Sequence, residues 1–474
     1  MRVMLVSSNQ ESLPDPVSPI GLAYLAGALR AAGHEVSILD LCFSPDIEAS
    51  IREGLKVFPP DIIGLSIRNV DNTAYPGTVS YIDPLRRVVG LLRRFSSAPI
   101  VAGGSGFTIM PKELLSLLDL EMGIVGEGEG SMVRLLASER SEEVPGLVRT
   151  TGGKFEATLP PSPSLDIDGL PQPAWDLLDL RTYLREGGTC NMQSKRGCAF
   201  QCIYCTYPLI EGGRVRLRDP KKVVAEMEGL QRDYGIDHFF FVDNVFNYPP
   251  HHAEAICERI LAQDLRIRWS CYAHPGYMSS KQAALMARSG CESVEFGTDS
   301  GSAAILAALR KNFGPSEIVR ASFSCRKAGL QFCHSLILGG PGEDRNTLDE
   351  TFRLMDEIDP TAVIAMIGVR VYPGTPLAQM LVRDGYLSPE DIAYPPKFYL
   401  SETLGDEVVD LVVKKAEGSR IWSVPGRSIN YSVRLQRLLR KRGKMGPTWG
   451  YMRYRRGRGQ SAGAEGEGGE SEEA

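Results

Sequence analysis

Long apolar runs and an N-terminal targeting pattern are both missing from this chain of 474 residues. No stretch reaches the roughly 18 to 20 apolar residues that a membrane-spanning helix requires. The first residues, MRVMLVSSNQE, have too short an apolar part for a signal peptide and predict a strand instead. We therefore expect a cytoplasmic protein whose ten cysteines are reduced, some of them with a metal-binding or redox role.

A positive net charge is missing as well. The formal charge is −5, so the overall balance does not attract nucleic acid, and we expect no nucleic-acid partner. Residues 434–458 depart from this average, because they are strongly basic with Trp449, Tyr451 and Tyr454 interleaved. They predict either a solvated helix and arm or a surface that meets an anionic membrane or an anionic substrate. The tail 457–474, rich in Gly and Glu, predicts disorder.

Strand and helix patterns alternate through most of the chain. In residues 1–140, apolar runs such as RVMLVS and DIIGLSI are separated by stretches with helical spacing, which indicates a doubly wound, Rossmann-like parallel sheet. Residues 141–189 are rich in Pro and Asp and predict a linker. A second alternating series over 190–390 has about six βα units and indicates a partial or full βα barrel. We expect a short helical extension over 391–456.

Three cysteines fall in one short predicted loop, KRGCAFQCIYCTY (195–207). Cys198, Cys202 and Cys205 have the spacing C-x3-C-x2-C, whereas structural zinc sites usually take four ligands in two pairs. Cys190 is a poor fourth ligand because it lies upstream at the approach to a strand. A cubane iron–sulfur cluster with one iron left open for a substrate or cosubstrate fits better, and zinc or unligated thiols are the alternatives. Five more cysteines lie in apolar patterns and predict small buried side chains: Cys257, Cys271, Cys291, Cys325 and Cys333.

The loop resembles the motif C-x3-C-x-aromatic-C of the radical S-adenosylmethionine (radical SAM) superfamily, with Tyr204 as the aromatic residue. The resemblance covers about residues 190–390 and continues in four later segments. These are FVDNVF (241–246), EFGTDSG (295–301), LILGGPGE (336–343) and VYPGTP (371–376). The resemblance implies that Cys198, Cys202 and Cys205 bind a [4Fe-4S] cluster. It also implies that S-adenosylmethionine chelates the open iron and is cleaved reductively to a 5′-deoxyadenosyl radical.

The same resemblance implies several cofactor contacts, each with a plainer alternative. The backbone of Tyr204 would lie near the adenine, or its ring simply packs beside the cluster. Asp243 would stand at the mouth after the second strand, or it is a helix N-cap. Glu295, Asp299 and Ser300 belong to the stretch that resembles the contact region for the amino-acid end and ribose of the cofactor. The plainer alternative for Glu295 and Asp299 is that they are structural polar residues at the end of a strand.

A doubly wound domain in front of such a barrel resembles the cobalamin-dependent branch of the superfamily. Three predicted loops at consecutive strand ends are similar to that branch: GLSIRN (64–69), AGGSGFT (102–108) and GIVGEGEGS (123–131). They imply a cobalamin site in which glycines let the backbone approach the nucleotide tail of the cofactor. The residues concerned are Ser66, Arg68, Gly103, Gly104 and Gly126. A domain that serves only as scaffold, or binds another nucleotide, is the alternative.

The first domain lacks the D-x-H-x-x-G pattern with which many cobalamin proteins place a histidine below the cobalt. The corresponding loop reads SSNQESLPDPVSP, and His34, the only histidine in the first 237 residues, predicts a surface position before the second strand. No imidazole ligand is therefore expected from this domain. Arg68 offers no lone pair, so it would block coordination at the lower face of the cobalt. The alternative is that Arg68 pairs with Asp71 or with the phosphate of the cofactor.

Together the two halves imply an enzyme that uses a [4Fe-4S] cluster, S-adenosylmethionine and cobalamin. We expect it to methylate an unactivated carbon of a small-molecule or lipid substrate, such as a secondary metabolite, with a flavodoxin- or ferredoxin-type electron donor. A cobalamin-dependent cyclisation or rearrangement without methyl transfer is one alternative. A cobalamin-free radical SAM enzyme, such as a tRNA-modifying methylthiotransferase, is another. A metal-binding or regulatory protein without turnover is the alternative from a different class.

Overall fold

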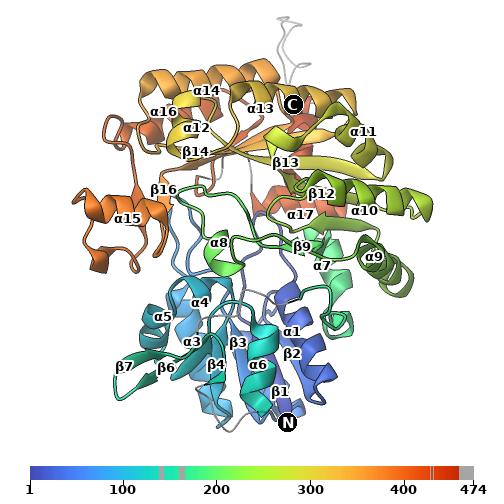
Figure 1. Ribbon diagram of the computed structural model, residues 1–474, viewed down its shortest axis with the longest axis vertical. Coiled ribbons are helices and arrows are strands. Elements are labelled where there is room, and N and C mark those ends of the chain that lie inside the picture. Colours follow the sequence, from blue (N-terminus) through green and yellow to red (C-terminus); the bar gives the residue numbers. More distant parts are fainter. Residues whose placement is uncertain (138–142, 160–165, 428, 431, 458–474) are drawn as a thin grey trace, which may run out of the picture.

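Two seven-stranded sheets, one in each half of the chain, form the framework of the computed structural model (Figure 1). The residues that the structure describes are 1–137, 143–159, 166–427, 429–430 and 432–457. The predicted disordered tail, 457–474, lies outside the described residues except for Gly457. Among the described helices, none combines the length and the apolar character that crossing a membrane would require.

The first sheet has the order β2-β1-β3-β4-β5-β6-β7, with β1 to β5 parallel. Its parallel strands are β1 (Arg2–Ser7), β2 (Glu35–Asp40), β3 (Ile62–Ser66), β4 (Ile100–Gly103) and β5 (Met122–Ile124). Its helices are α1 (Ile20–Ala31), α2 (Ile47–Val57), α3 (Ile82–Phe95), α4 (Ser105–Ile109), α5 (Pro111–Leu117) and α6 (Gly128–Ala137). Apolar clusters fill both faces, one under α1 and α6 and the other under α2, α3 and α5. The strand order reverses between β1 and β3, where doubly wound folds bind ligands.

The first sheet continues into the segment for which the sequence predicts a linker, 141–189. β6 (Leu147–Thr151) and β7 (Lys154–Ala157) form an antiparallel hairpin that pairs with β5. Its turn is made by Gly152 and Gly153, both with positive φ, as a tight hairpin turn requires. The rest of the segment also carries a helix, α7 (Leu180–Gly187).

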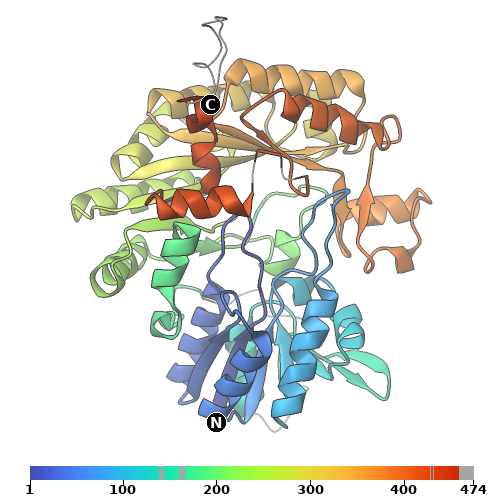
Figure 2. The ribbon, with the colours of Figure 1, turned by 180° about the vertical axis from the view of Figure 1, so that it is seen from behind.

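The second sheet has the order β18-β15-β14-β13-β12-β11-β8, and all its pairings are parallel. Its strands are β8 (Cys190–Met192), β11 (His238–Phe241), β12 (Arg268–Ala273), β13 (Cys291–Asp299), β14 (Gln331–Leu338), β15 (Ala362–Ile367) and β18 (Trp422–Ser423). The outer helices are α9 (Pro220–Tyr234), α10 (Pro250–Ala262), α11 (Ser280–Arg288), α12 (Ala303–Ala308), α13 (Pro315–Lys327), α14 (Arg345–Ile358) and α16 (Glu407–Glu417). The sheet curves over the first domain without closing, which confirms the predicted fold class of a doubly wound domain followed by a partial βα barrel (Figures 1 and 2).

The C-terminal segment packs against both halves. It contains α17 (Val433–Lys441), beside the loop that follows β1 (Figure 2), and a 3₁₀ helix, Thr448–Gly457. Arg440 is buried and its guanidinium lies 2.7 Å from the Asp15 carboxylate of that loop. Trp449 is 6% exposed and packs in a cluster with Cys333 of β14 and Ala362 of β15. The prediction of a solvated basic helix therefore holds for Arg434 and Arg437 on α17, which are exposed, but it is wrong for Arg440 and Trp449.

Candidate functional site

The cysteine loop follows β8 and the short strand β9 (Lys195–Arg196), and neighbouring backbone holds it in place. Gly197 has a φ of +88°, and a Cβ there would lie 2.1 Å from the Arg214 carbonyl oxygen, so the position requires glycine. Ile203 is buried in a core cluster, and its amide donates to the Leu309 carbonyl at 3.3 Å. The loop is therefore a fixed platform.

The structure brings the three predicted ligand cysteines together. Burial raises the pKa of each thiol, and charge on Cys202 raises the pKa of Cys198 and Cys205 further. All cysteines of the chain are free thiols. Within the described residues, no three His, Cys, Asp or Glu side chains surround one point as a single metal ion demands. Three free thiols on one rigid loop fit a cubane, in which each thiolate binds a different iron.

Lys311, in the turn after α12, is a functional candidate that the sequence did not suggest. Its ammonium lies 2.8 Å from the Asp299 carboxylate, and the two side chains are only 8% and 4% exposed. The positive charge of Lys311 lowers the pKa of the thiols of Cys198, Cys202 and Cys205. At Cys202, this effect exceeds the opposite effect of Asp299. The ion pair therefore presents a net positive field to the cysteine loop.

The residues of EFGTDSG differ in where they point. Asp299, with a φ of +66°, also accepts a 2.5 Å hydrogen bond from the Tyr204 hydroxyl, so it lies beside the cysteine loop. Ser300 is fully buried, and its hydroxyl pairs with Thr351 of α14 at 3.0 Å, away from that loop. Glu295 lies four residues before Asp299 on β13, roughly 13 Å away along the strand. The structure therefore brings Asp299 and Tyr204 to the cysteines, but not Glu295.

Asp243 positions the chain that leads into the loop. It is 1% exposed, and its carboxylate accepts hydrogen bonds from the Ser194 amide at 2.7 Å, the Ser194 hydroxyl at 2.5 Å and the Lys195 amide at 3.2 Å. The helix that follows, α10, has Pro249 at its N-cap position, so the N-cap alternative for Asp243 is wrong. Asp243 instead fixes the entry to the cysteine loop.

The predicted cobalamin residues gather at the carboxyl edge of the first sheet. Ser66 and Gly103 are register partners at the ends of β3 and β4, and Gly126 follows β5. All three are partly exposed, as is Gly104. A Cβ on Gly104 would lie 2.7 Å from the Ile67 carbonyl oxygen, so the loops after β3 and β4 require this glycine in order to pack on one another. This open, glycine-rich edge fits a large cofactor that backbone must approach closely.

Arg68 stands on the same edge with its side chain exposed. Burial raises the pKa of Tyr207, next to the cysteine loop, and of Tyr272 on the barrel sheet, and the charge of Arg68 opposes this rise at both, so Arg68 lies between the two halves. The alternative pairing of Arg68 with Asp71 is wrong, because the Asp71 carboxylate pairs with Arg370 at 3.1 Å. His34 precedes β2 at the opposite edge of the sheet, beside the N-terminal amine.

Buried ion pairs join the segments on either side of the cysteine loop to the carboxyl edge of the first sheet. Arg196, two residues before Cys198, pairs with Glu127 of the loop after β5 at 3.2 Å and with Glu129 of the first turn of α6 at 2.7 Å. Arg216, beyond the cysteine loop, pairs with Glu127 at 2.6 Å. These side chains are at most 12% exposed. The two Glu residues of GEGEG therefore hold the segments before and after the cysteine loop through buried ion pairs.

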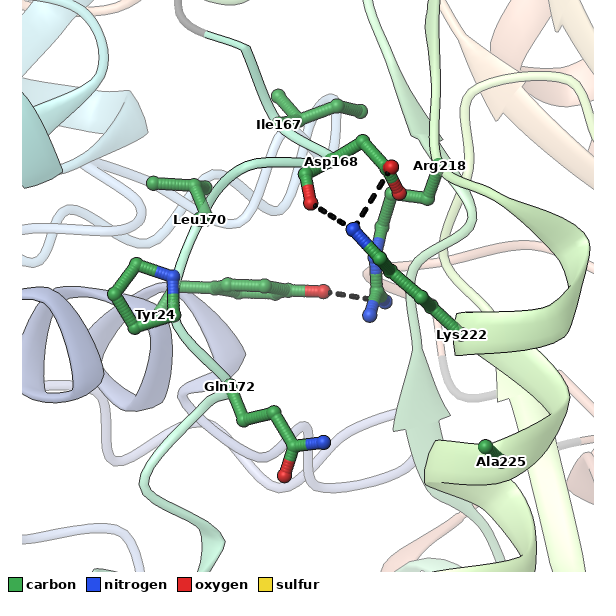
Figure 3. Close-up of a pocket in the computed structure, with 9 residues that line it drawn as sticks. Tyr24, Ile167, Asp168, Leu170, Gln172, Arg218, Lys222 and Ala225 are labelled. Atoms are coloured by element: carbon green, nitrogen blue, oxygen red, sulfur yellow. Dashed lines mark hydrogen bonds and ion pairs between the residues drawn. The ribbon is translucent and has the colours of Figure 1, made fainter.

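A small pocket of about 130 Å³ lies at another junction of the two halves, beside α9 (Figure 3). Its polar groups already bond to one another. Lys222 pairs with Asp168 at 2.9 Å, and Arg218 donates to the Tyr24 hydroxyl at 2.8 Å (Figure 3). We interpret this pocket as part of the domain junction.

Comparison with known proteins identifies both domains. Residues 192–355 match the family model of the radical SAM superfamily, and residues 10–136 match that of the B12 binding domain. The chain belongs to the cobalamin-dependent radical SAM family. Its cofactors are accordingly a [4Fe-4S] cluster, S-adenosylmethionine and cobalamin, as predicted.

Relatives of this radical SAM protein match most of its length. An uncharacterized methyltransferase of Pyrococcus horikoshii is 28% identical over 400 residues, which covers 82% of this chain and 84% of the relative. A tryptophan 2-C-methyltransferase of Streptomyces laurentii is 27% identical over 450 residues, with 80% and 74% covered. The structure of the radical SAM methyltransferase TsrM from Kitasatospora setae, with cobalamin and a [4Fe-4S] cluster bound, superposes with a TM-score of 0.84 at 24% identity. That superposition covers 96% of this chain and 97% of TsrM, so the two proteins share one fold.

Proposed function

We propose that this radical SAM enzyme transfers a methyl group to a carbon atom of a small organic substrate held between its two domains. One observation carries the proposal: buried ion pairs from Arg196 to Glu127 and Glu129 hold the cysteine loop against the carboxyl edge of the B12 binding domain. The two cofactor sites therefore open toward a shared space. The methyltransferase names of the relatives from P. horikoshii and S. laurentii support methyl transfer as the reaction.

The cysteine loop and its neighbours would hold the first two cofactors. In this proposal Cys198, Cys202 and Cys205 would bind three irons of the cluster, and Tyr204 and Asp299 would lie beside it. When bound, the cluster supplies one-electron chemistry to S-adenosylmethionine, and cobalamin supplies methyl transfer. Lys311 would place a positive charge beside the thiolates, and Asp243 would hold the segment between β8 and the cysteine loop in position.

The B12 binding domain would hold cobalamin along its carboxyl edge. Ser66 and the glycines after β4 and β5 present backbone to the cofactor, and Arg68 lies between that edge and the barrel. Its guanidinium has no lone pair, so it would offer the cobalt no nitrogen ligand and would leave less room for water there. His34 is at the far edge and takes no part.

Substrate and electron donor complete the proposal. Tryptophan as the named substrate of one relative supports a small molecule, and a lipid or secondary metabolite is the class that we propose from the sequence. A flavodoxin- or ferredoxin-type protein would supply the electron. A membrane surface would meet the exposed Arg434 and Arg437 of α17.

Anaerobic reconstitution tests this function directly. The purified chain is incubated with iron, sulfide and hydroxocobalamin, desalted, and given S-adenosylmethionine with a deuterated methyl group, a reductant and an extract of small molecules. We expect a retained corrinoid spectrum, about four irons per chain and deuterated methyl groups in one extract component. Loss of the corrinoid on desalting would contradict the cobalamin role. Formation of 5′-deoxyadenosine without label transfer would favour cyclisation or rearrangement.

A further inference from the structure

Part of the inner face of the barrel sheet is accessible and aromatic. Phe240 on β11 and Glu295 on β13 are partly exposed, although Ser270 and Ser293 on the same face are buried. Tyr272 on β12 is 38% exposed, and its register partner on β13 is Glu295. The ring of Phe240 on β11 meets the ring of Tyr272 edge to face at 4.9 Å. Phe240, Tyr272 and Glu295 therefore form one continuous patch.

The Glu295 carboxylate in this patch is hydrogen-bonded to neutral groups. It accepts a 2.7 Å hydrogen bond from the Ser335 hydroxyl. Burial raises the pKa of Glu295, the nearby Asp15 raises it further, and the Ser335 hydroxyl and the Trp449 indole oppose them. Among the side chains that the structure describes, which end at Met452, no Lys or Arg forms an ion pair with Glu295. Glu295 is partly buried, and a cation stabilises a carboxylate whose access to water is reduced, so this position is suited to a cation from outside the chain.

We infer that Phe240, Tyr272 and Glu295 bind an organic ammonium group of the substrate. This inference rests on the proposed function and names the chemistry of its substrate. The carboxylate supplies a charge-assisted hydrogen bond, and the neighbouring aromatic rings attract a cation through their faces. Because Glu295 is roughly 13 Å from Asp299 along β13, an ammonium group bound here lies well away from the cysteine loop. The substrate is therefore an amine whose apolar body extends along the inner face toward the cofactors.

A matched pair of ligands tests this site in the full chain. Tryptamine and indole-3-propionate share a ring and a two-carbon arm, and they differ in carrying an ammonium or a carboxylate. Equilibrium dialysis at pH 7.5 should show tryptamine binding with a dissociation constant at least about tenfold lower than that of indole-3-propionate. Glu295→Gln should weaken tryptamine binding about tenfold, and Tyr272→Leu about threefold.

The control variant is Glu292→Gln on the same strand. Glu292 is exposed at the start of β13 and pairs with Arg268 at 3.2 Å, so tryptamine binding should be unchanged. Equal affinities for the two ligands, no tryptamine binding up to 10 mM, or an unaltered affinity in Glu295→Gln would each overturn the inference. The comparison of the two ligands on the wild-type chain needs no variant, so a misfolded Glu295→Gln protein does not leave the question open.

The failure of this inference differs from failure of the proposed function. Loss of corrinoid or iron on desalting contradicts the function, whatever tryptamine does. Retained cofactors together with indifference to the ammonium group contradict only the amine site.

Discussion

The two sheets of this protein bury their strands differently. β1 of the first sheet has an unbroken apolar run with only Arg2 partly exposed, because helices cover both faces. β13 and β14 of the second sheet alternate between buried and accessible residues, because helices cover only the outer face. A sheet buried on both faces offers ligands only its edge, whereas the barrel sheet offers an edge and a face. This difference explains why the barrel is suited to hold a cluster and a substrate, and the first domain a single cofactor.

Loss of one thiolate should have the largest effect, because it removes the function of the barrel edge outright. Replacing Cys198, Cys202 or Cys205 by Ala should abolish cleavage of S-adenosylmethionine, since a cluster with one open iron needs all three thiolates. The measurement is 5′-deoxyadenosine formation by the reconstituted protein. Full cleavage by Cys202→Ala would refute the ligand assignment.

Cys190 provides the matched control. It is fully buried on β8, and burial raises the pKa of its thiol to about 12, which suits a small apolar core residue rather than a thiolate ligand. Cys190→Ala should therefore leave the iron content almost unchanged. A large loss of iron would show that Cys190 is a ligand.

Breaking the buried ion pair between Asp71 of the first domain and Arg370 of the second should have the next largest effect. Asp71 follows β3 and Arg370 lies on β16 (Val369–Val371), and their side chains are 0% and 5% exposed. Asp71→Asn leaves a buried guanidinium without its counter-charge, so we expect a loss of about 3–5 kcal/mol in the free energy of unfolding. Urea denaturation measures it. Asp83→Asn is the control, because its pair with Arg86 is solvent-exposed and should contribute less than about 1 kcal/mol. Equal losses in both variants would mean that the buried pair does not stabilise the fold.

Local patterns in the sequence predicted most of the fold and part of the site. The apolar runs RVMLVS and DIIGLSI contain β1 and β3, and the cysteine loop was recognisable because its three thiols are close in sequence. The β6–β7 hairpin and the two-residue strand β18 were missed, since such short strands show too few periods to stand out. The partner of Asp71 was missed for another reason: Arg370 comes from a distant segment, and only the fold shows that the two meet. Lys311 likewise has no local signal.

Lys311 provides a further contrast between the two domains, because its charge lies on the barrel side, beside the cysteine loop. Lys311 pairs with Asp299, but its charge outweighs that of Asp299 at Cys202, so it should stabilise an electron added to the cluster. Lys311→Met should lower the midpoint potential of the cluster by tens of millivolts, up to on the order of 100 mV. A redox titration followed by electron paramagnetic resonance measures the shift. Lys281→Met, at an exposed position of α11, should leave the potential unchanged. Equal potentials in both variants would exclude the electrostatic role of Lys311.

Arg68 should give the smallest effect, confined to the electronic state of cobalt. Arg68 lies on the edge of the first sheet with an exposed side chain, and its charge opposes the rise that burial causes in the pKa of Tyr207 and Tyr272 of the barrel. Asp71 is already paired with Arg370, so it does not hold Arg68. We predict that the Co(II) spectrum of the wild type shows no nitrogen ligand, because the guanidinium has no lone pair and takes the place of water. Arg68→His should introduce a nitrogen hyperfine pattern, and Arg68→Ala should admit water and shift the signal without that pattern. A nitrogen ligand already present in the wild type, or a signal that neither change alters, would mean that Arg68 instead contacts the phosphate of the cofactor or solvent.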